Sequence, residues 1–263
     1  MTTTAALESH LRELGSVLVC FSGGVDSSYL LAVAHRALGD GAVGFTAVSP
    51  SLPPEEAEAA RALAARLGVR QRSVATHELD DARYASNPVD RCYFCKTEVY
   101  GVASAEAEAL GLAAVVDGFN RDDRGDHRPG RRAAKELGVR SPLDELGFDK
   151  AAIRREAKAL GLGVWDKPAL ACLASRFPYG LPITPDRLGQ VARAERAIRA
   201  MGFRVVRVRH HGRRARVEVA ATEVPRLRGR WAEVNAALRA CGYGEVELEP
   251  RGYRRGALNK EVR

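Results

Sequence analysis

Short apolar runs alternate with longer helix-like segments over the first 120 residues, and this order constrains the fold more than any other feature. Strands separated by helices are typical of a parallel sheet with helices on both faces. We therefore predict an α/β fold with a doubly wound, mostly parallel sheet. The predicted strands are 17–21, 42–48, 69–75 and 113–116, and the predicted helices between them are 27–38, 53–67 and 93–110.

The second half of the sequence predicts a smaller α+β domain. A charged loop with one short helix covers 120–142, and a helix covers 148–160. The prolines of 166–185 argue against a helix or a central strand there. Further on we expect a helix at 185–202, paired strands at 203–210 and 216–220, a helix at 224–240 and a strand at 244–249. Three parts are expected: a nucleotide-binding domain (1–165), a cysteine-bearing loop with a connecting helix (166–202) and an arginine-rich domain (203–263).

The net charge of +8 over 263 residues is unevenly distributed. Residues 1–200 carry 26 basic and 26 acidic side chains, whereas 201–263 carry 15 and 7. Only 6 of the 41 cations are lysine, and arginine is the cation suited to phosphate and carboxylate. No apolar run approaches the roughly 20 residues of a membrane span, and the first residues do not resemble a signal peptide. A cytoplasmic protein without a membrane partner is expected.

A polar loop with two glycines follows the first predicted strand directly, with the sequence Ser22-Gly23-Gly24-Val25-Asp26-Ser27-Ser28. Glycines let backbone amides turn toward an anion, and the start of the next helix adds partial positive charge. The hydroxyls of Ser22, Ser27 and Ser28 add donors. This loop contains neither Gly-Lys-Ser/Thr nor Gly-x-Gly-x-x-Gly, which excludes the usual P-loop and the dinucleotide fingerprint at this position. The loop is predicted to bind a pyrophosphate group.

Asp26 stands among these phosphate-binding groups. A carboxylate repels a polyphosphate unless a divalent cation lies between them, so Asp26 indicates Mg²⁺ as a cofactor. Ligands of such sheets bind beyond the carboxyl ends of the strands. We therefore also assign Val48, the last residue of the second predicted strand, to the nucleotide site.

Three of the five cysteines lie in unusual surroundings. Cys92 and Cys95 form a Cys-x-x-Cys at a predicted helix start between Arg91 and Lys96, a setting that lowers thiol pKa values. Zinc prefers four ligands, and a second Cys-x-x-Cys is absent. Cys172 lies in the proline-rich segment, and three thiolates suit a [4Fe-4S] cluster with one open iron. A redox disulfide of Cys92 with Cys95, and Cys172 as a packing residue, are the alternatives.

Five stretches carry a resemblance to a known family. The loop at 22–28 is similar to the Ser-Gly-Gly-x-Asp-Ser motif of the PP-loop ATP pyrophosphatase superfamily. In combination the stretches resemble the LarE family of ATP-dependent sulfur transferases, in its three-cysteine iron-sulfur type, over nearly the whole chain. The other four are Asn-Pro-x-x-Arg-Cys-x-x-Cys-Lys at 87–96, the stretch at 117–130, Ala-Cys-Leu-Ala-Ser-Arg-Phe-Pro-Tyr-Gly at 171–180 and Gly-Tyr-Arg-Arg-Gly-Ala-Leu-Asn at 252–259.

The resemblance implies sulfur insertion into pyridinium-3,5-biscarboxylic acid mononucleotide, the precursor of the nickel-pincer nucleotide cofactor of lactate racemase. ATP would adenylate a carboxylate, and a sulfur nucleophile would displace AMP to leave a thiocarboxylate. In the three-cysteine type, a cluster on Cys92, Cys95 and Cys172 carries sulfide from an external donor. In the sacrificial type, one cysteine gives up its own sulfur and becomes dehydroalanine. We predict the cluster type, with sacrificial transfer from Cys172 as the alternative.

The resemblance also assigns residues to the nucleotide. It places Asp117 and Asn120 near the nucleotide and adds Asp122 to Asp26 at the Mg²⁺ ion. The residues that it assigns to the triphosphate are Ser22, Gly23, Gly24, Asp26, Ser27 and Ser28. Lys96 is assigned to the nucleotide phosphates or to the adenylate.

The substrate implied by the resemblance has two carboxylates and a phosphate, groups that arginine binds in a bidentate, oriented way. Arg207 and Arg209 lie two apart on a predicted strand and share one face, and Glu218 falls on the partner strand. The residues assigned to the substrate are Ser175, Arg176, Arg207, Arg209 and Arg254.

Other functions remain open at this point. A PP-loop tRNA thiolase would use the same loop, but the sequence has no recognisable RNA module and few aromatic residues, so nucleic acid is not expected as a partner. An amidotransferase-type synthetase would leave three thiols without a role. A nucleotide or iron-sulfur sensor would bind without turnover. The family resemblance also favours a homo-oligomer.

Overall fold

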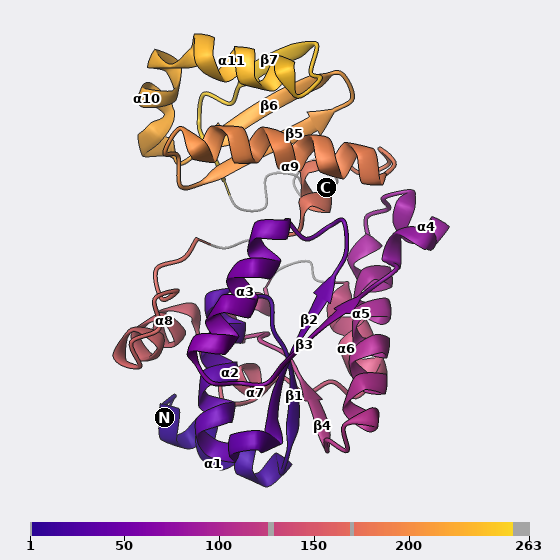
Figure 1. The fold of residues 1–263 in the computed structure, drawn as a ribbon, viewed down its shortest axis with the longest axis vertical. Helices are drawn as coiled ribbons and strands as arrows, with labels where there is room; N and C mark the ends of the chain where they lie inside the picture. Colours follow the sequence, from indigo (N-terminus) through magenta and orange to yellow (C-terminus); the bar gives the residue numbers. More distant parts are fainter. Residues whose placement is uncertain (1, 126–128, 169–170, 255–263) are drawn as a thin grey trace. The chain divides into compact units, whose positions relative to one another are not determined.

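The computed structural model describes residues 2–125, 129–168 and 171–254 (Figure 1). The chain forms two compact units. The first combines Met1–Glu78 with Asp90–Leu170, and the second combines Leu79–Val89 with Ala171–Arg263. The division into 1–165, 166–202 and 203–263 remains a prediction about functional parts.

A four-stranded, all-parallel sheet with the order β3-β2-β1-β4 forms the centre of the first unit. Val17 of β1 lies beside both Ala42 and Ala114, so β1 is an inner strand. All four strands fall within runs that the sequence predicted as strands. They are β1 (Val17–Cys20), β2 (Ala42–Val48), β3 (Gln71–Ala75) and β4 (Ala114–Val116).

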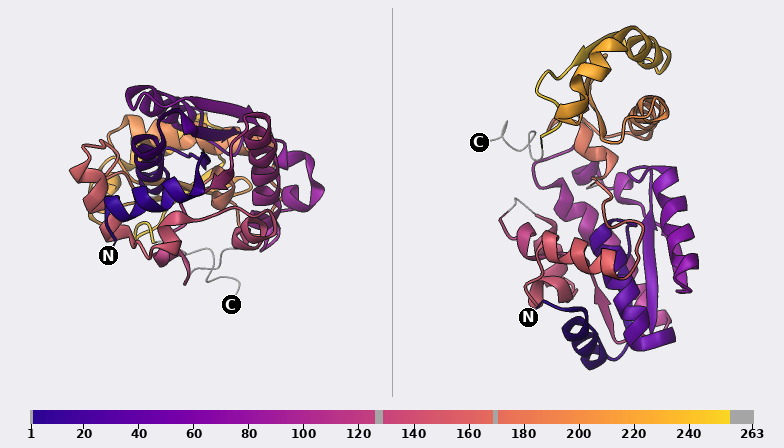
Figure 2. Two further views of the ribbon diagram at one scale, coloured as in Figure 1. Left: turned by 90° about the horizontal axis from the view of Figure 1, so that it is seen from below. Right: turned by 90° about the vertical axis from the view of Figure 1, so that its left-hand side faces the viewer.

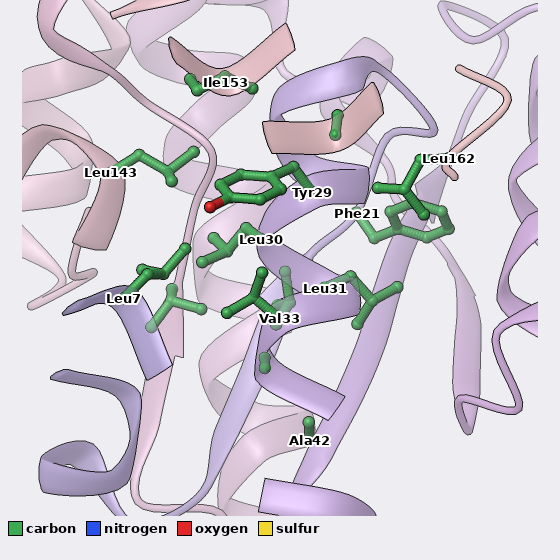
Figure 3. Packing of buried hydrophobic residues seen from close by; sticks show 14 of the residues in the cluster. Leu7, Phe21, Tyr29, Leu30, Leu31, Val33, Ala42, Leu143, Ile153 and Leu162 are labelled. Atoms are coloured by element: carbon green, nitrogen blue, oxygen red, sulfur yellow. The ribbon is translucent and has the colours of Figure 1, made fainter. Parts of the chain in front are cut away.

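Helices cover both faces of this sheet. Because strand side chains alternate between faces, Val17 and Val19 pack with Tyr29 on one face, whereas Leu18 packs with Tyr100 on the other. Figure 3 shows the first of these cores, where Tyr29 lies among leucines from several elements. The predicted doubly wound α/β fold is therefore confirmed. The helices of this unit are α1 (Thr4–Leu14), α2 (Val25–Leu38), α3 (Pro54–Arg66), α5 (Arg91–Ala109), α6 (Gly130–Glu136), α7 (Pro142–Glu145) and α8 (Lys150–Ala159).

Helix α1 was not among the predicted elements. Thr3 caps it by accepting a hydrogen bond from the backbone N–H of Ala6 at 3.3 Å. Leu7 and Leu11 are four residues apart, so they share one face of the helix and are fully buried in the core. These two signals were present in the sequence.

The second unit contains a three-stranded sheet of order β5-β6-β7, with β5 antiparallel to β6 and β6 parallel to β7. Helix α9 packs on β5, and α11 packs on α9 and β7. The part of the unit that begins at Ala171 runs from salmon to yellow in Figures 1 and 2. The helices and strands of the whole second unit are α4 (Ala82–Ala85), α9 (Pro185–Ala200), β5 (Val206–His211), β6 (Arg214–Val219), α10 (Val224–Gly229), α11 (Trp231–Ala240) and β7 (Glu245–Leu248).

The single helix predicted at 224–240 is wrong, because two helices occupy this range. The break falls at Arg230, whose φ of −108° and ψ of 20° leave the helical region. Arg230 donates a hydrogen bond to the carbonyl oxygen of Met201 at 2.9 Å. Gly229 precedes the break, and glycine is a poor helix former.

Among the described residues, no helix has the length and apolar character that a membrane crossing requires.

Candidate functional site

The loop from Ser22 to Gly24 connects the carboxyl end of β1 to the start of α2. Gly23 has a φ of +70°, a conformation that glycine adopts readily. A Cβ atom on Gly23 would lie 3.2 Å from Cβ of Ala60 in α3. Gly24 is extended and precedes the helix, whose first hydrogen bond runs from the N–H of Ser28 to the Gly24 carbonyl at 2.9 Å. The loop is thus shaped as a turn into a helix N-terminus.

The serine hydroxyls of this loop have different roles. Oγ of Ser27 accepts from the backbone N–H of Ser22 and donates to the carbonyl of Gly24, both at 3.2 Å, so it stabilises the turn. Oγ of Ser28 is buried and has no hydrogen-bond partner among the described residues. The hydroxyl of Ser22 lies 3.2 Å from that of Ser27.

Asp26 is in the first turn of α2, and its Oδ2 accepts a hydrogen bond from the ammonium group of Lys150. Its Oδ1 is buried without a partner in the described part of the chain. Oδ2 of Asp122 accepts from the backbone N–H of Lys150 at 2.9 Å. The two carboxylates assigned to Mg²⁺ therefore meet at the same residue, the first of α8.

Mg²⁺ requires oxygen ligands, which Asp26 and Asp122 can supply. Within the described ranges, no three His, Cys, Asp or Glu side chains are grouped as a metal site. Mg²⁺ is commonly held by one or two carboxylates together with substrate phosphates and water. Asp26, whose Oδ1 has no partner among the described residues, and Asp122 fit that pattern beside the loop that the sequence predicts to bind pyrophosphate. What such an ion would supply is neutralisation of the triphosphate charge.

The loop after β4 packs closely against the start of α2. A Cβ atom on Gly118 would lie 3.0 Å from the backbone nitrogen of Ser27. Asp117 accepts hydrogen bonds from Tyr100 at 2.6 Å and from Ser141 at 2.7 Å, so both its oxygens are engaged inside the unit. Burial, followed by the charge of Asp117, raises the pKa of Tyr100 well above its ordinary value. Asp117 thus anchors this loop.

Asn120 ends the same loop as a helix cap. Its Oδ1 accepts from the N–H of Asp122 at 3.1 Å, and the carboxylate of Asp123 accepts from the N–H of Asn120 at 3.4 Å. This reciprocal pair is a capping box that fixes the turn carrying Asp122. Val48 closes β2, and its carbonyl accepts from the N–H of Thr76 at 3.1 Å.

Two lysines at the phosphate loop were missed by the sequence reasoning. Lys150 contacts Asp26, and Lys167 donates to the carbonyl of Gly23 at 3.1 Å and to Glu56 at 2.8 Å. Both lysines are more than 120 residues from the loop along the chain, so no local pattern reveals these contacts. Together they bring two cations to the predicted pyrophosphate site.

The Cys-x-x-Cys stands at the start of α5. Cys92 is exposed, Cys95 is half-buried, and no disulfide joins them in the described structure. Lys96 follows, with its ammonium nitrogen 4.8 Å from the centroid of the Tyr100 ring. A Cβ atom on Gly130 would lie 2.7 Å from Cγ of Lys96, so only a glycine lets α6 approach this part of α5 so closely.

Cys172 lies in the second unit, where it precedes a 3₁₀ turn at Leu173–Arg176 and has an exposed side chain. Arg176 and Arg209 are buried and paired with glutamates: Arg176 with Glu195 at 2.7 Å, and Arg209 with Glu218 at 2.7 Å. Although burial by itself would raise the pKa of Glu195, the guanidinium groups of Arg176 and Arg199 hold it below its ordinary value.

The other two arginines assigned to the substrate differ in exposure. Arg207 is buried, and its guanidinium carbon lies 5.1 Å from the centroid of the Tyr253 ring. Burial, followed by the charge of Arg176, lowers the pKa of Arg207 to about 10. Arg207 lies opposite Glu218 in the strand register, yet Glu218 pairs with Arg209. Arg254 is exposed.

Asn87, near the Cys-x-x-Cys in sequence, belongs to the second unit. Its side-chain NH₂ group donates to the backbone carbonyls of Pro178 at 2.7 Å and Leu181 at 2.9 Å. The backbone carbonyl of Asn87 accepts from the N–H of Gly180 at 2.9 Å. Its φ of +60° makes it unusual among the described non-glycine residues. Asn87 thereby holds the 178–181 segment that follows the Cys172 turn.

Comparison with known proteins gives matches over part and over nearly all of the chain. A family model described as asparagine synthase matches residues 2–101. An uncharacterized protein of Synechocystis is 44% identical over 256 residues, which are 97% of this chain and 96% of that protein. The pyridinium-3,5-bisthiocarboxylic acid mononucleotide synthase of Lactiplantibacillus plantarum is 37% identical over 259 residues, which are 98% of this chain and 94% of that protein. An uncharacterized protein of Methanocaldococcus jannaschii is 32% identical over 133 residues, which are 51% of this chain and 52% of that protein.

Proposed function

The chain belongs to the LarE family, the family of the Lactiplantibacillus plantarum synthase, and from this membership we propose that it is an ATP-dependent sulfur transferase. Its substrate is pyridinium-3,5-biscarboxylic acid mononucleotide, whose carboxylates it converts to thiocarboxylates. The observation that carries the proposal is the 37% identity to that synthase over 98% of this chain, which includes both units. The arrangement around the phosphate loop supports the use of ATP.

The reaction has two steps. In the first, a carboxylate oxygen of the substrate attacks the α-phosphorus of ATP, and pyrophosphate leaves. In the second, a sulfur nucleophile attacks the carbonyl carbon of the acyl adenylate, and AMP leaves with the bonding electrons. The backbone amides of the loop at 22–28 and the side chains of Lys150 and Lys167 bind the phosphates in the first step. Asp26 and Asp122 would hold a Mg²⁺ ion, which would neutralise phosphate charge.

The sulfur is proposed to come from an external sulfide donor. Cys92, Cys95 and Cys172 supply three thiolates for a [4Fe-4S] cluster, a donor set that leaves one iron open for sulfide. The exposed thiols of Cys92 and Cys172 are compatible with that role. The cationic side chains at 207 and 254 bind the carboxylates and the phosphate of the substrate. The protein is further proposed to be a homo-oligomer.

The decisive experiment follows ATP, substrate and protein in one reaction. Protein reconstituted anaerobically with iron and sulfide is incubated with MgATP and the biscarboxylate, and pyrophosphate, AMP and the masses of product and protein are measured. We expect pyrophosphate release that depends on the biscarboxylate, a product with sulfur in place of oxygen, and an iron-sulfur absorption band. Release without any dependence on this carboxylate contradicts the proposed substrate. Dehydroalanine at Cys172 after turnover contradicts the cluster and shows sacrificial transfer.

Two serine variants separate adenylation from sulfur delivery. Cys172→Ser should keep the pyrophosphate release of the first turnover, because the phosphate loop lies in the first unit, and should lose thiocarboxylate formation. Cys241→Ser is the matched control, since Cys241 is a half-buried thiol of the second unit at the end of α11. It should keep both steps. Equal losses in the two variants would show that Cys172 has no special role.

A further inference from the structure

The backbone around Cys172 is held by an unusual set of hydrogen bonds. Its carbonyl oxygen accepts from the N–H of Ser175 at 3.0 Å, from Oγ of Ser175 at 2.8 Å and from Nη1 of Arg176 at 3.0 Å. Nη1 of Arg176 also donates to the carbonyl of Ala171 at 2.8 Å. Two successive carbonyl groups, on either side of the Cys172 side chain, are therefore bound by the same guanidinium group.

The opposite edge of that guanidinium group is bound by a buried carboxylate. Nε and Nη2 of Arg176 donate to the two oxygens of Glu195 at 2.7 and 3.0 Å, a bidentate pair. Arg176 is 1% exposed and Glu195 is fully buried. All three guanidinium nitrogens are thus engaged inside the unit.

Glu195 is itself fixed to two elements of the second unit. It lies on α9, and its carboxylate also accepts from the backbone N–H of Val208 in β5 at 3.0 Å and from Arg199 at 2.6 Å. A buried carboxylate with this many donors has one well-defined position. Arg176 therefore connects the Cys172 turn to the framework formed by α9 and β5.

A second arginine holds the other end of the same turn. Nη1 of Arg209 donates to the carbonyl of Ser175 at 2.8 Å, while Nη2 donates to Glu218 at 2.7 Å. Each arginine has a glutamate on one side and a carbonyl of the turn on the other. The turn carries an exposed thiol on a backbone that is fixed from two directions.

We infer that Arg176, anchored by Glu195, is a positioning residue that fixes the main chain of Cys172 for sulfur transfer and does not bind the substrate. The inference rests on the proposed function, because it assigns Cys172 to the sulfur site. It reverses the role that the sequence resemblance gives to Arg176. Positioning matters for rate because a misplacement of about 1 Å costs on the order of a hundredfold.

The test compares lysine substitutions of two arginines that bind the same carboxylate, that of Glu195. Arg176→Lys keeps the charge, but one ammonium group cannot reach both Glu195 and the two carbonyls in the geometry of the planar fork. Arg199→Lys is the matched control, because Arg199 is half-buried and donates to Glu195 through one nitrogen, a contact that a lysine ammonium group can keep. Hydrogen exchange of the 171–177 peptide, kcat and KM for the biscarboxylate, and pyrophosphate release are measured for both.

For Arg176→Lys we expect about tenfold faster exchange of the 171–177 peptide, with α9 and β5 unchanged. The kcat of thiocarboxylate formation should fall by about a hundredfold, with KM within about twofold of wild type. Arg199→Lys should resemble wild type in each readout. A raised KM for the biscarboxylate, with kcat and the hydrogen exchange of the turn unchanged, would show that Arg176 binds the substrate. Faster exchange across the whole second unit would show a general structural role. Either result overturns the inference.

If Arg176→Lys does not fold, Arg209→Lys removes the second support of the turn and should give the same pattern of lower kcat at unchanged KM. If the wild-type protein forms no thiocarboxylate, the proposed function fails, while the exchange of the 171–177 peptide still reports whether Arg176 fixes the turn. An unchanged exchange rate in both variants contradicts the inference by itself.

Discussion

The carboxylate of Asp26 is paired with the ammonium group of Lys150, a residue 124 positions further along the chain. The pair joins the first turn of α2 to the first residue of α8. Because the backbone N–H of Lys150 also binds Asp122, both carboxylates assigned to Mg²⁺ are held by one residue. Two carboxylates and a cation are therefore held together by contacts between α2, α8 and the turn that carries Asp122.

Replacing Asp26 by asparagine should strongly slow the first step, the formation of the acyl adenylate. The amide cannot neutralise Mg²⁺ or Lys150, so transition-state stabilisation is lost, and pyrophosphate release should fall by about a hundredfold or more. Asp40→Asn is the control, because Asp40 is exposed at the opposite end of α2. Pyrophosphate release is measured at saturating biscarboxylate over a range of Mg²⁺ concentrations. Full activity of Asp26→Asn would remove Asp26 from the metal site.

Gly118 should not tolerate a side chain. Its Cβ atom would lie 3.0 Å from the backbone nitrogen of Ser27, and backbone atoms at a helix start cannot easily give way. We expect Gly118→Ala to raise KM for ATP and to lower the free energy of unfolding by about 1–2 kcal/mol. Gly101→Ala in α5 is the control, since open space surrounds it, and helix propensity predicts a gain of up to about 1 kcal/mol. An unchanged KM for ATP in Gly118→Ala would contradict this account.

Local sequence signals were sufficient for the sheet and the loop of the first unit. The runs that contain β1, β2 and β4 are apolar, and the more polar run of β3 follows Gly68. The loop at 22–28 lies at the strand end where a doubly wound sheet binds ligands. Helix α1 could have been found from Thr3 with Leu7 and Leu11. The break at Arg230 had Gly229 as a local signal, but the hydrogen bond from Arg230 to Met201, which follows α9, could not be predicted from the sequence.

The side-chain roles were less accessible to sequence reasoning. Lys150 and Lys167 reach the phosphate loop through contacts between distant parts of the chain, which leave no local pattern. Arg176 matches the family motif, yet the motif does not show whether its guanidinium faces a ligand or a buried Glu195. Long-range pairing of this kind follows from packing, so only the folded structure displays it.

Asn87→Ala should destabilise the second unit. The change leaves the carbonyls of Pro178 and Leu181 without their donors and puts an alanine at a φ of +60°. The expected loss is about 2–4 kcal/mol. Asn87→Gly removes only the hydrogen bonds, so it should lose less. Ser86→Ala, at an exposed neighbour, should stay within about 0.5 kcal/mol of wild type.

The chain offers a direct way to measure this loss. It has two tryptophans, of which Trp165 lies in the first unit and Trp231 in the second. In a Trp165→Phe background, the fluorescence of Trp231 reports on the second unit during urea unfolding. Equal stability of Asn87→Ala and Ser86→Ala in this assay would contradict the role given to Asn87.

Acid should destabilise the second unit through His210. Its ring lies 5.0 Å from that of Phe177 between centroids, and its Nδ1 lies 3.1 Å from the hydroxyl of Tyr243. Burial, followed by the charges of Arg187 and His211, lowers the pKa of His210 from 6.5 to about 4. The folded state thus prefers the neutral ring. The neutral His210 ring therefore contributes to the stability of the second unit; this contribution is complete above about pH 6.5 and is lost as the pH falls through about 4.

The pH dependence can be measured with the Trp231 reporter in the Trp165→Phe background. Between pH 6.5 and 4, the urea midpoint of the second unit should fall more steeply with His210 present than in His210→Phe, because the unfolded state of the parent binds a proton that the folded state resists. His35→Gln, in the first unit, should leave this slope unchanged. Parallel slopes for the parent and His210→Phe would assign the acid sensitivity to other groups, because the phenylalanine variant has nothing to titrate at this position.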